Sequence, residues 1–115
     1  DIIRRAAMQA LLELKDVRAL PFALTYSGLG NANDIRRQSV RLLGELGIGS
    51  REARERLHAL VYDGVSSIRK AAVEGLVLSG DDQASDILER LKLVEKDESV
   101  KKAIEQAMEV ISDER

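Results

Sequence analysis

Cysteine is absent from this 115-residue chain, and proline occurs once, as Pro21. Without cysteine the chain has no disulfide and no thiol site. The composition fits a reducing compartment, so we expect a cytoplasmic protein. Aromatic residues make up only 3% of the chain, with no tryptophan. The chain therefore has few side chains for stacking on nucleic-acid bases or for anchoring a protein interface.

Histidine is also scarce, because His58 is the only one. A zinc site built on histidines needs further ligands at defined spacing, and the zinc-protease helix motif needs two histidines. We therefore predict no metal, no cofactor and no catalytic residue within this chain. His58 follows Leu57 of an expected apolar stripe, which predicts a surface position for it.

Long hydrophobic runs are missing too, since none approaches the roughly 20 residues that a membrane span needs. No signal-peptide pattern stands at the start. Hydrophobic residues make up 44% and charged residues 33%, with acids and bases interspersed and a net charge of −2. This is typical of a single globular domain, here residues 1–115. It predicts neither a membrane partner nor bulk attraction to a polyanion.

What the sequence does contain is one short phrase in four copies, a branched apolar residue followed by two cations. The copies are Ile3-Arg4-Arg5, Ile35-Arg36-Arg37, Ile68-Arg69-Lys70 and Val100-Lys101-Lys102. Their first residues are spaced 32, 33 and 32 residues apart. Such a period is typical of solenoids, in which stacked helix pairs bury one another's apolar faces.

Apolar residues recur at helical spacing through each copy and again between copies. The pattern predicts seven helices, over residues 3–14, 17–26, 34–46, 50–62, 68–79, 81–94 and 97–112. Pro21 belongs in a first turn, and Gly47 is expected to end its helix in the left-handed conformation. Expected N-caps are Asn33 or Asp34, Ser50, Ser66 or Ser67, and Asp81 or Asp82. No segment alternates with a period of two, so the fold class is all-α.

The best-formed copy resembles the HEAT-like repeats, in the short form first named from phycobilin lyases. The resemblance rests on Ile35-Arg36, Ser39, Leu42-Leu43 and Leu46-Gly47, and it extends over essentially the whole chain. It implies a right-handed α-solenoid of about three and a half helical hairpins. It also implies that the four cation-bearing helices form the concave side.

This arrangement leaves the first helix without a partner on one side. The apolar stripe of residues 3–14 would be half uncovered, so we expect further repeats or another domain upstream of Asp1. The last helix ends in a polar tail, which is typical of a terminal repeat.

The basic pairs form two ladders along the expected concave side. The resemblance gives the first cation of each pair a structural role against an aspartate or carbonyl groups of the neighbouring repeat. That structural ladder comprises Arg4, Arg36, Arg69 and Lys101, with Asp34, Asp63 and Asp97 as partners. The second ladder, together with its neighbours, is the expected partner-binding face: Arg5, Arg37, Arg41, Lys70, Glu74 and Lys102. Five apolar residues outside the main stripe are expected to pack between repeats or to form a patch beside the arginines: Met8, Leu12, Val77, Leu78 and Val110.

Three functions remain open on these grounds. The first is a non-catalytic scaffold whose concave surface binds another protein or an attached domain of the same parent chain. A second is the C-terminal helical domain of a larger enzyme such as a zinc aminopeptidase, because residues 18–22 and the linker at Gly30-Asn31 are similar to such tails. A third is binding of a nucleic-acid backbone along the basic ladder. The net acidity, the scarcity of aromatics and the glutamates on the same helices disfavour it. A phycobilin-lyase role is a further option that the family label alone suggests.

Overall fold

The computed structural model describes residues 2–14 and 16–113, apart from the side chains of Leu12 and Leu14. These residues contain seven α-helices and one short 3₁₀ helix, and no strand occurs among them. The elements are α1 (Ile2–Leu14), η1 (Val17–Ala19), α2 (Leu20–Tyr26), α3 (Asn33–Leu46), α4 (Arg51–Leu60), α5 (Ser66–Ser79), α6 (Ala84–Val94) and α7 (Glu98–Asp113). The expected all-α class and the seven helices are thus confirmed.

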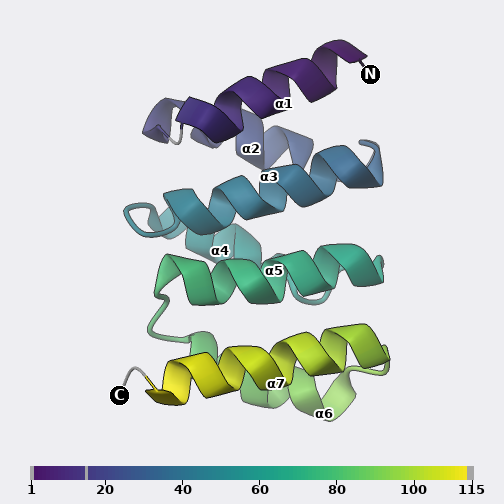
Figure 1. The fold of residues 1–115 in the computed structure, drawn as a ribbon, viewed down its shortest axis with the longest axis vertical. Helices are drawn as coiled ribbons and strands as arrows, with labels where there is room; N and C mark the ends of the chain where they lie inside the picture. Colours follow the sequence, from purple (N-terminus) through teal and green to yellow (C-terminus); the bar gives the residue numbers. More distant parts are fainter. Residues whose placement is uncertain (1, 15, 114–115) are drawn as a thin grey trace.

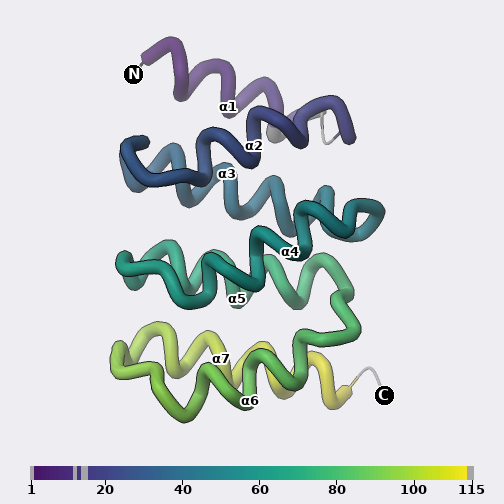
Figure 2. The backbone as a smooth tube through the Cα atoms, turned by 180° about the vertical axis from the view of Figure 1, so that it is seen from behind, coloured from purple at the N-terminus to yellow at the C-terminus, as the bar shows by residue number. Residues whose placement is uncertain are grey.

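The helices form two layers. In Figure 1, α1, α3, α5 and α7 lie side by side in front, all running in the same direction, and α2, α4 and α6 lie behind them. Figure 2 shows the rear layer from its own side. Each front helix turns back through a rear helix before the next front helix begins, and the chain winds in a right-handed sense (Figures 1 and 2). This is the predicted α-solenoid, and its front layer is formed by the four cation-bearing helices.

The core runs the length of the stack and repeats with the sequence. The first residue of the phrase is fully buried in three copies, as Ile35, Ile68 and Val100. Leu57 of α4 and Leu88 of α6 close the core from the rear layer, also without exposed surface. Burying an aliphatic side chain of this size stabilises the fold by about 1.5–3 kcal/mol.

The outer side of α1 differs from this pattern. Ile3 occupies the same position in its copy and is 84% exposed, as is Ile2 beside it. On its inner side α1 buries Met8 completely against the stack. Leu12, which was expected to pack similarly, lies outside the described side chains. The described residues therefore cover the apolar stripe of α1 on its inner side but not on its outer side.

Two helix starts follow the predicted signals, and two further helix ends have clear caps. Pro21 lies in the first turn of α2, and the Ser50 hydroxyl accepts a hydrogen bond from the Ala53 amide at the start of α4. Gly80 ends α5 with φ of 67°, a left-handed conformation that glycine adopts without strain. Asp97 caps α7 by accepting from the Ser99 and Val100 amides.

Other helix ends were predicted wrongly. Gly47 ends α3 with φ of −62°, so the expected left-handed cap is absent there. The N-caps of α3 and α5 are Ala32 and Val65, neither of which caps with its side chain. At α5 the serines lie inside the helix, and the Asp63 carboxylate instead accepts from the Val65 amide. Capping at this end thus comes from a residue upstream of the predicted serines.

Two glycines allow α3 and α5 to approach closely. A Cβ atom added to Gly44 would lie 2.8 Å from the Cα of Gly75 on the neighbouring helix. Real Cβ atoms do not come so near to backbone, so residue 44 must lack a side chain at this crossing. The contact between α3 and α5 is in consequence backbone against backbone at this point.

Candidate functional site

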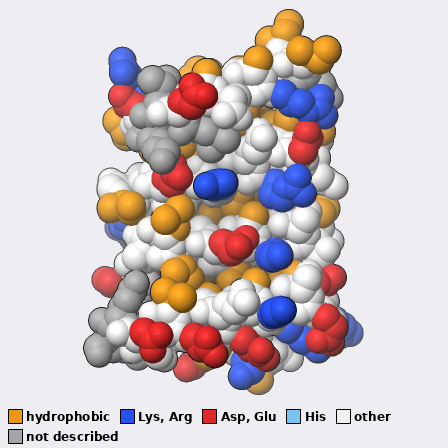
Figure 3. Space-filling view, in the orientation of Figure 1, with side chains coloured by type: hydrophobic (Ala, Val, Ile, Leu, Met, Phe, Trp, Pro, Cys, Tyr) orange, Lys and Arg blue, Asp and Glu red, His pale blue; other side chains and the backbone are white. Residues whose placement is uncertain are grey.

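The front face, meaning the exposed surface of α1, α3, α5 and α7, carries most of the predicted binding residues. Figure 3 shows this face with basic side chains over its upper and middle part, apolar surface visible between the helices, and a row of acidic side chains near its lower edge. On α7 the exposed acids include Glu98, Glu105 and Glu109. Acidic side chains are thus most frequent near the α7 edge, although Lys102 is exposed there and acids also occur in the upper part of the face.

The first cation of the phrase forms a bidentate ion pair in the two middle copies. Arg36 is 2% exposed. Its guanidinium donates to both carboxylate oxygens of Asp63, at 2.6 and 3.2 Å, and to the Ser27 carbonyl at 2.9 Å. Arg69 likewise binds both oxygens of Glu95, at 2.9 and 3.1 Å, and the Asp63 carbonyl at 2.9 Å. Arg36 is therefore part of the interior, and Arg69, with a side chain 20% exposed, is already engaged by Glu95 and the Asp63 carbonyl.

The other two copies differ from this arrangement. Arg4 is exposed and donates to the Asn31 side chain at 3.1 Å, whereas Lys101 contacts Glu98 of its own helix at 3.3 Å. The structural ladder is therefore built from buried ion pairs only in the two middle copies.

Two predicted partners of the structural ladder have other roles. Asp34 pairs with Arg5, at 2.7 Å from Nε to Oδ2, and not with Arg4. Arg5, expected to be free for a partner, is thereby held on the surface by α3. Asp97 hydrogen-bonds the start of its own helix, while Arg69 pairs with Glu95. Sequence reasoning missed Glu95 altogether.

A signal for Glu95 does exist in the spacing. Arg4 and Asn31 are 27 residues apart, Arg36 and Asp63 are also 27 apart, and Arg69 and Glu95 are 26 apart. In each of these repeats the connection from the rear helix to the next front helix thus places the partner residue beside the cation of the preceding phrase. Counting this interval from Arg69 leads to position 96, which lies between Glu95 and Asp97, and the structure shows that Glu95 is the partner.

The buried acids titrate below their usual range. Burial by itself raises the pKa of Asp63, but the hydrogen bonds from Arg36 and the Val65 amide outweigh it and lower the pKa overall. The pKa of Glu95 is lowered in the same way against its burial, by Arg69 and by the amides that follow it. Both carboxylates are therefore held in the charged form that the arginines need.

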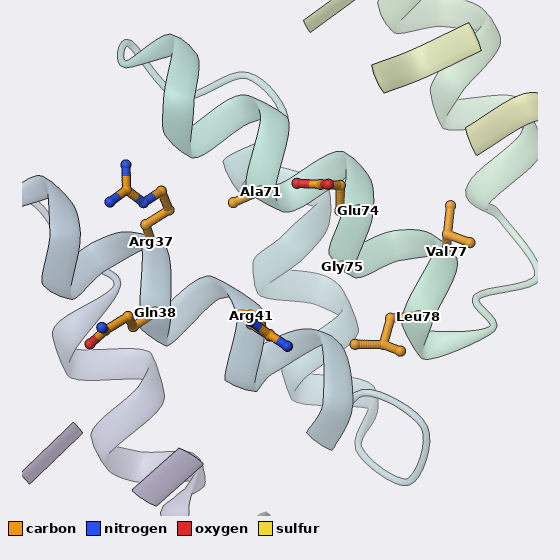
Figure 4. Close-up of a pocket in the computed structure, with 8 residues that line it drawn as sticks. All are labelled: Arg37, Gln38, Arg41, Ala71, Glu74, Gly75, Val77 and Leu78. Carbon is orange, nitrogen blue, oxygen red and sulfur yellow. The ribbon is translucent and has the colours of Figure 1, made fainter. Parts of the chain in front are cut away.

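A groove of about 630 Å³ lies on the front face between α3 and α5. From α3 it is lined by Arg37, Gln38 and Arg41. From α5 it is lined by Ala71, Glu74, Gly75, Val77 and Leu78. Figure 4 shows the two arginines on the α3 side, Glu74 across from Arg37, and Val77 and Leu78 toward the C-terminal end of α5. The groove thus has a basic wall, an apolar end and one acid on the opposite wall.

Three of the predicted binding residues meet in this groove, namely Arg37, Arg41 and Glu74. All three are exposed and form no ion pair with any residue that the structure describes. Lys70 and Lys102 are exposed on α5 and α7 but do not line it. Leu78 is 47% exposed beside the arginines, as expected for an apolar patch there, whereas Met8 is fully buried. Arg37 and Arg41 share a side of α3 because they are four residues apart.

A second hollow lies over α4 and the connection that leads to α6 and contains His58 and Asp81. His58, predicted to lie at the surface, has a side chain that is 28% exposed, and its ring also hydrogen-bonds Asp81, whose side chain is 6% exposed. The other oxygen of Asp81 accepts from the Gln83 amide, so the acid joins α4 to the start of α6. No group of three potential metal ligands occurs among the described residues.

A model of the HEAT repeats matches residues 30–109, well over half of the chain. The chain belongs to the HEAT repeat family. HEAT repeats generally serve as scaffolds for protein interactions and are typically non-catalytic. A comparison of this HEAT repeat protein with curated proteins finds no match. Within the described part of the chain, no helix has the length and apolar character needed to cross a membrane.

Proposed function

We propose that this HEAT repeat protein is a non-catalytic docking module and that it binds a partner protein through the groove between α3 and α5. The observation that carries the proposal is the pair of exposed arginines, Arg37 and Arg41, which form no ion pair with a described residue and lie beside an apolar end at Val77 and Leu78. Interfaces commonly combine arginine with a partly apolar surface in this way. The partner is another protein or a domain of the same parent chain.

A nucleic-acid backbone is supported less well by the same face. A phosphate track needs a run of available cations, and Arg36 and Arg69 are already engaged by Asp63 and Glu95. The exposed acids of α7 repel phosphate at one end of the face. The groove lining also contains no aromatic residue on which a base could stack.

Affinity capture from an extract of the source cells tests the proposal. The bait is the whole chain as wild type or as Arg37→Glu/Arg41→Glu. The control, Arg90→Glu/Lys92→Glu, reverses two exposed charges on α6, in the rear layer. We expect proteins that bind the wild type and the control to be depleted at least about tenfold on the groove variant, since attraction is replaced by repulsion.

Thermal unfolding of the three baits completes the test. Exposed residues without partners contribute little to stability, so we expect all three to melt within a few degrees of one another. Equal capture by the groove variant and the wild type would remove this groove as the binding site. Loss of capture by the α6 control alone would move the site to the rear layer.

A further inference from the structure

Resting on the proposed function, we propose that the occupant of the groove is an acidic amphipathic helix. One edge of this helix carries two carboxylates four residues apart, which face Arg37 and Arg41. Its apolar side rests on the end of the groove at Val77 and Leu78. The inference concerns the chemistry of the partner, which the geometry of the lining residues specifies.

Charge complementarity is the first argument. Arg37 and Arg41 are four residues apart on α3, so their side chains leave the helix about one turn apart. Both are exposed and make no ion pair or hydrogen bond with any described residue. Carboxylates at positions i and i+4 of a partner helix have the same spacing, so a helix lying along α3 meets both arginines at once. An arginine prefers a carboxylate because its planar guanidinium can bind both oxygens.

The state of the neighbouring cations sharpens this argument. Arg5 is already held by Asp34 at 2.7 Å, and Arg36 is buried with Asp63 at 2.6 Å. On α3, therefore, Arg37 and Arg41 are the cations left for an outside acid among the residues that the structure describes. On α3 the attraction is concentrated over one turn beside the groove, whereas Lys70 of α5 and Lys102 of α7 are exposed outside the groove lining.

The shape of the groove is the second argument. Its volume of about 630 Å³ lies within the range of ligand clefts and accommodates several side chains, but not a whole helix. A helix must therefore lie over the groove and insert one side. At the Val77 and Leu78 end this side has to be apolar, because an unpaired polar group buried there would lose its hydrogen bonds with water. This is the pattern of a helix laid into a groove.

Glu74 defines the remaining edge of the occupant. It lies on α5 across from Arg37 (Figure 4) and has no ion pair among the described residues. A carboxylate on the α5 side of the occupant would be repelled, whereas a lysine there would be attracted. The occupant thus has acids on its α3 edge, apolar residues on its inner side and a cation on its α5 edge. This asymmetry fixes the orientation in which a helix can bind.

The inference is tested with a fluorescein-labelled synthetic peptide about four helical turns long. The peptide has Glu at i and i+4, leucines on the adjacent side and one Lys on the opposite edge. Three matched peptides serve as controls: one with the glutamates changed to Lys, one with a central proline that breaks the helix, and one of scrambled sequence. Binding to the whole chain is measured by fluorescence anisotropy at low salt.

We expect the acidic helical peptide to bind the wild type at least about tenfold more tightly than any of the three controls. Arg37→Glu/Arg41→Glu should reverse the preference, losing the Glu peptide and gaining the Lys peptide. Leu78→Asp should weaken the Glu peptide, and Arg90→Glu/Lys92→Glu should leave it unchanged. The exchanged preference is decisive, because general damage to the fold cannot create binding of the Lys peptide.

Three outcomes would overturn the inference. They are no binding of the Glu peptide, equal binding of the proline or scrambled peptide, and tighter binding of a single-stranded oligonucleotide that is lost in the same arginine variant. If the peptide fails while the capture experiment still depends on Arg37 and Arg41, only the acidic-helix inference falls. If neither the peptide binding nor the capture depends on Arg37 and Arg41, the groove is excluded as a docking site as well.

Discussion

Arg36 and Arg37 are adjacent in the sequence but have opposite surroundings. The Arg36 side chain is 3% exposed and pairs with Asp63, whereas Arg37 is exposed in the groove. A buried ion pair adds little compared with an apolar pair of the same shape, but removing one partner leaves the other charge buried without compensation. The two residues therefore make a natural comparison, because one supports the fold and the other is available for binding.

Replacing each arginine by methionine separates these roles. We expect Arg36→Met to lower the free energy of unfolding by about 3–5 kcal/mol, because Asp63 loses its counter-charge and the Ser27 carbonyl loses its donor. Arg37→Met should change it by less than about 0.5 kcal/mol. Urea unfolding followed by circular dichroism measures both. Comparable losses in the two variants would contradict a structural role specific to Arg36.

At the scale of the element, the crossing of α3 and α5 positions both walls of the groove. Gly44 lies where the two backbones meet, and a Cβ there would be 2.8 Å from the Gly75 Cα. A Cβ on Gly75 would instead approach Leu57 Cδ2 at 3.0 Å, which is the mobile end of a side chain. The same methyl group is thus obstructed by rigid backbone in one case and by an adjustable side chain in the other.

The two alanine variants should therefore differ in stability. In Gly44→Ala the helices must separate, at a cost of about 1–3 kcal/mol for overpacking, which exceeds the roughly 1 kcal/mol that alanine gains over glycine in a helix. In Gly75→Ala a rotation of Leu57 relieves the contact, so we expect a smaller loss or none. Thermal unfolding of both proteins tests this order. A more stable Gly44→Ala than Gly75→Ala would show that α3 and α5 adjust freely.

Across the whole molecule, buried acid–arginine pairs make stability depend on pH. The pKa values of Asp63 and Glu95 are lower in the folded chain than in the unfolded one, so the unfolded state takes up protons first as the pH falls. Their contribution is complete above the unfolded values of about 4. It is lost as the pH falls from there through the folded values.

We therefore expect the free energy of unfolding to be nearly constant from about pH 7 to pH 5 and to fall steeply below about pH 4. Glu95→Gln removes one of the titrating acids, so it should be less stable at neutral pH but lose less on acidification. Glu109→Gln alters an exposed acid of α7 that has no ion pair among the described residues, and it serves as the matched control. Urea midpoints over this pH range give the comparison. An identical pH profile for Glu95→Gln and the wild type would be the contrary result.

The periodic part of the structure was readable from the sequence. The interval between the basic phrases and the apolar spacing within them led to the helices and their order, and the resemblance to HEAT-like repeats led to the layer in which the cations lie. These features depend on local patterning repeated four times, which a single sequence displays. The positions of Ile35, Ile68 and Val100 in the core follow from the same repetition.

The specific pairings were less accessible. Glu95 and not Asp97 reaches Arg69, and Asp34 reaches Arg5, because the shape of each connection decides which side chain arrives at a cation. The sequence around His58 does not indicate its contact with Asp81, which is 23 residues away and lies in the connection between α5 and α6. That Arg37, Arg41 and Glu74 line one groove depends on the distance between α3 and α5. Glycines set this distance, and helical periodicity does not reveal it.

Asp63 links two neighbouring front helices. Its carboxylate accepts hydrogen bonds from Arg36 of α3, and its backbone carbonyl oxygen accepts one from Arg69 of α5. Bending the solenoid at this point would stretch both contacts together, so the middle of the molecule should be stiff. Near α1 the links are exposed to solvent, because Arg4 donates to Asn31 and Arg5 pairs with Asp34 on the surface. A protein that binds to α3 and α5 would therefore contact a rigid surface. Any bending of the solenoid when the partner binds should occur between α1 and α3.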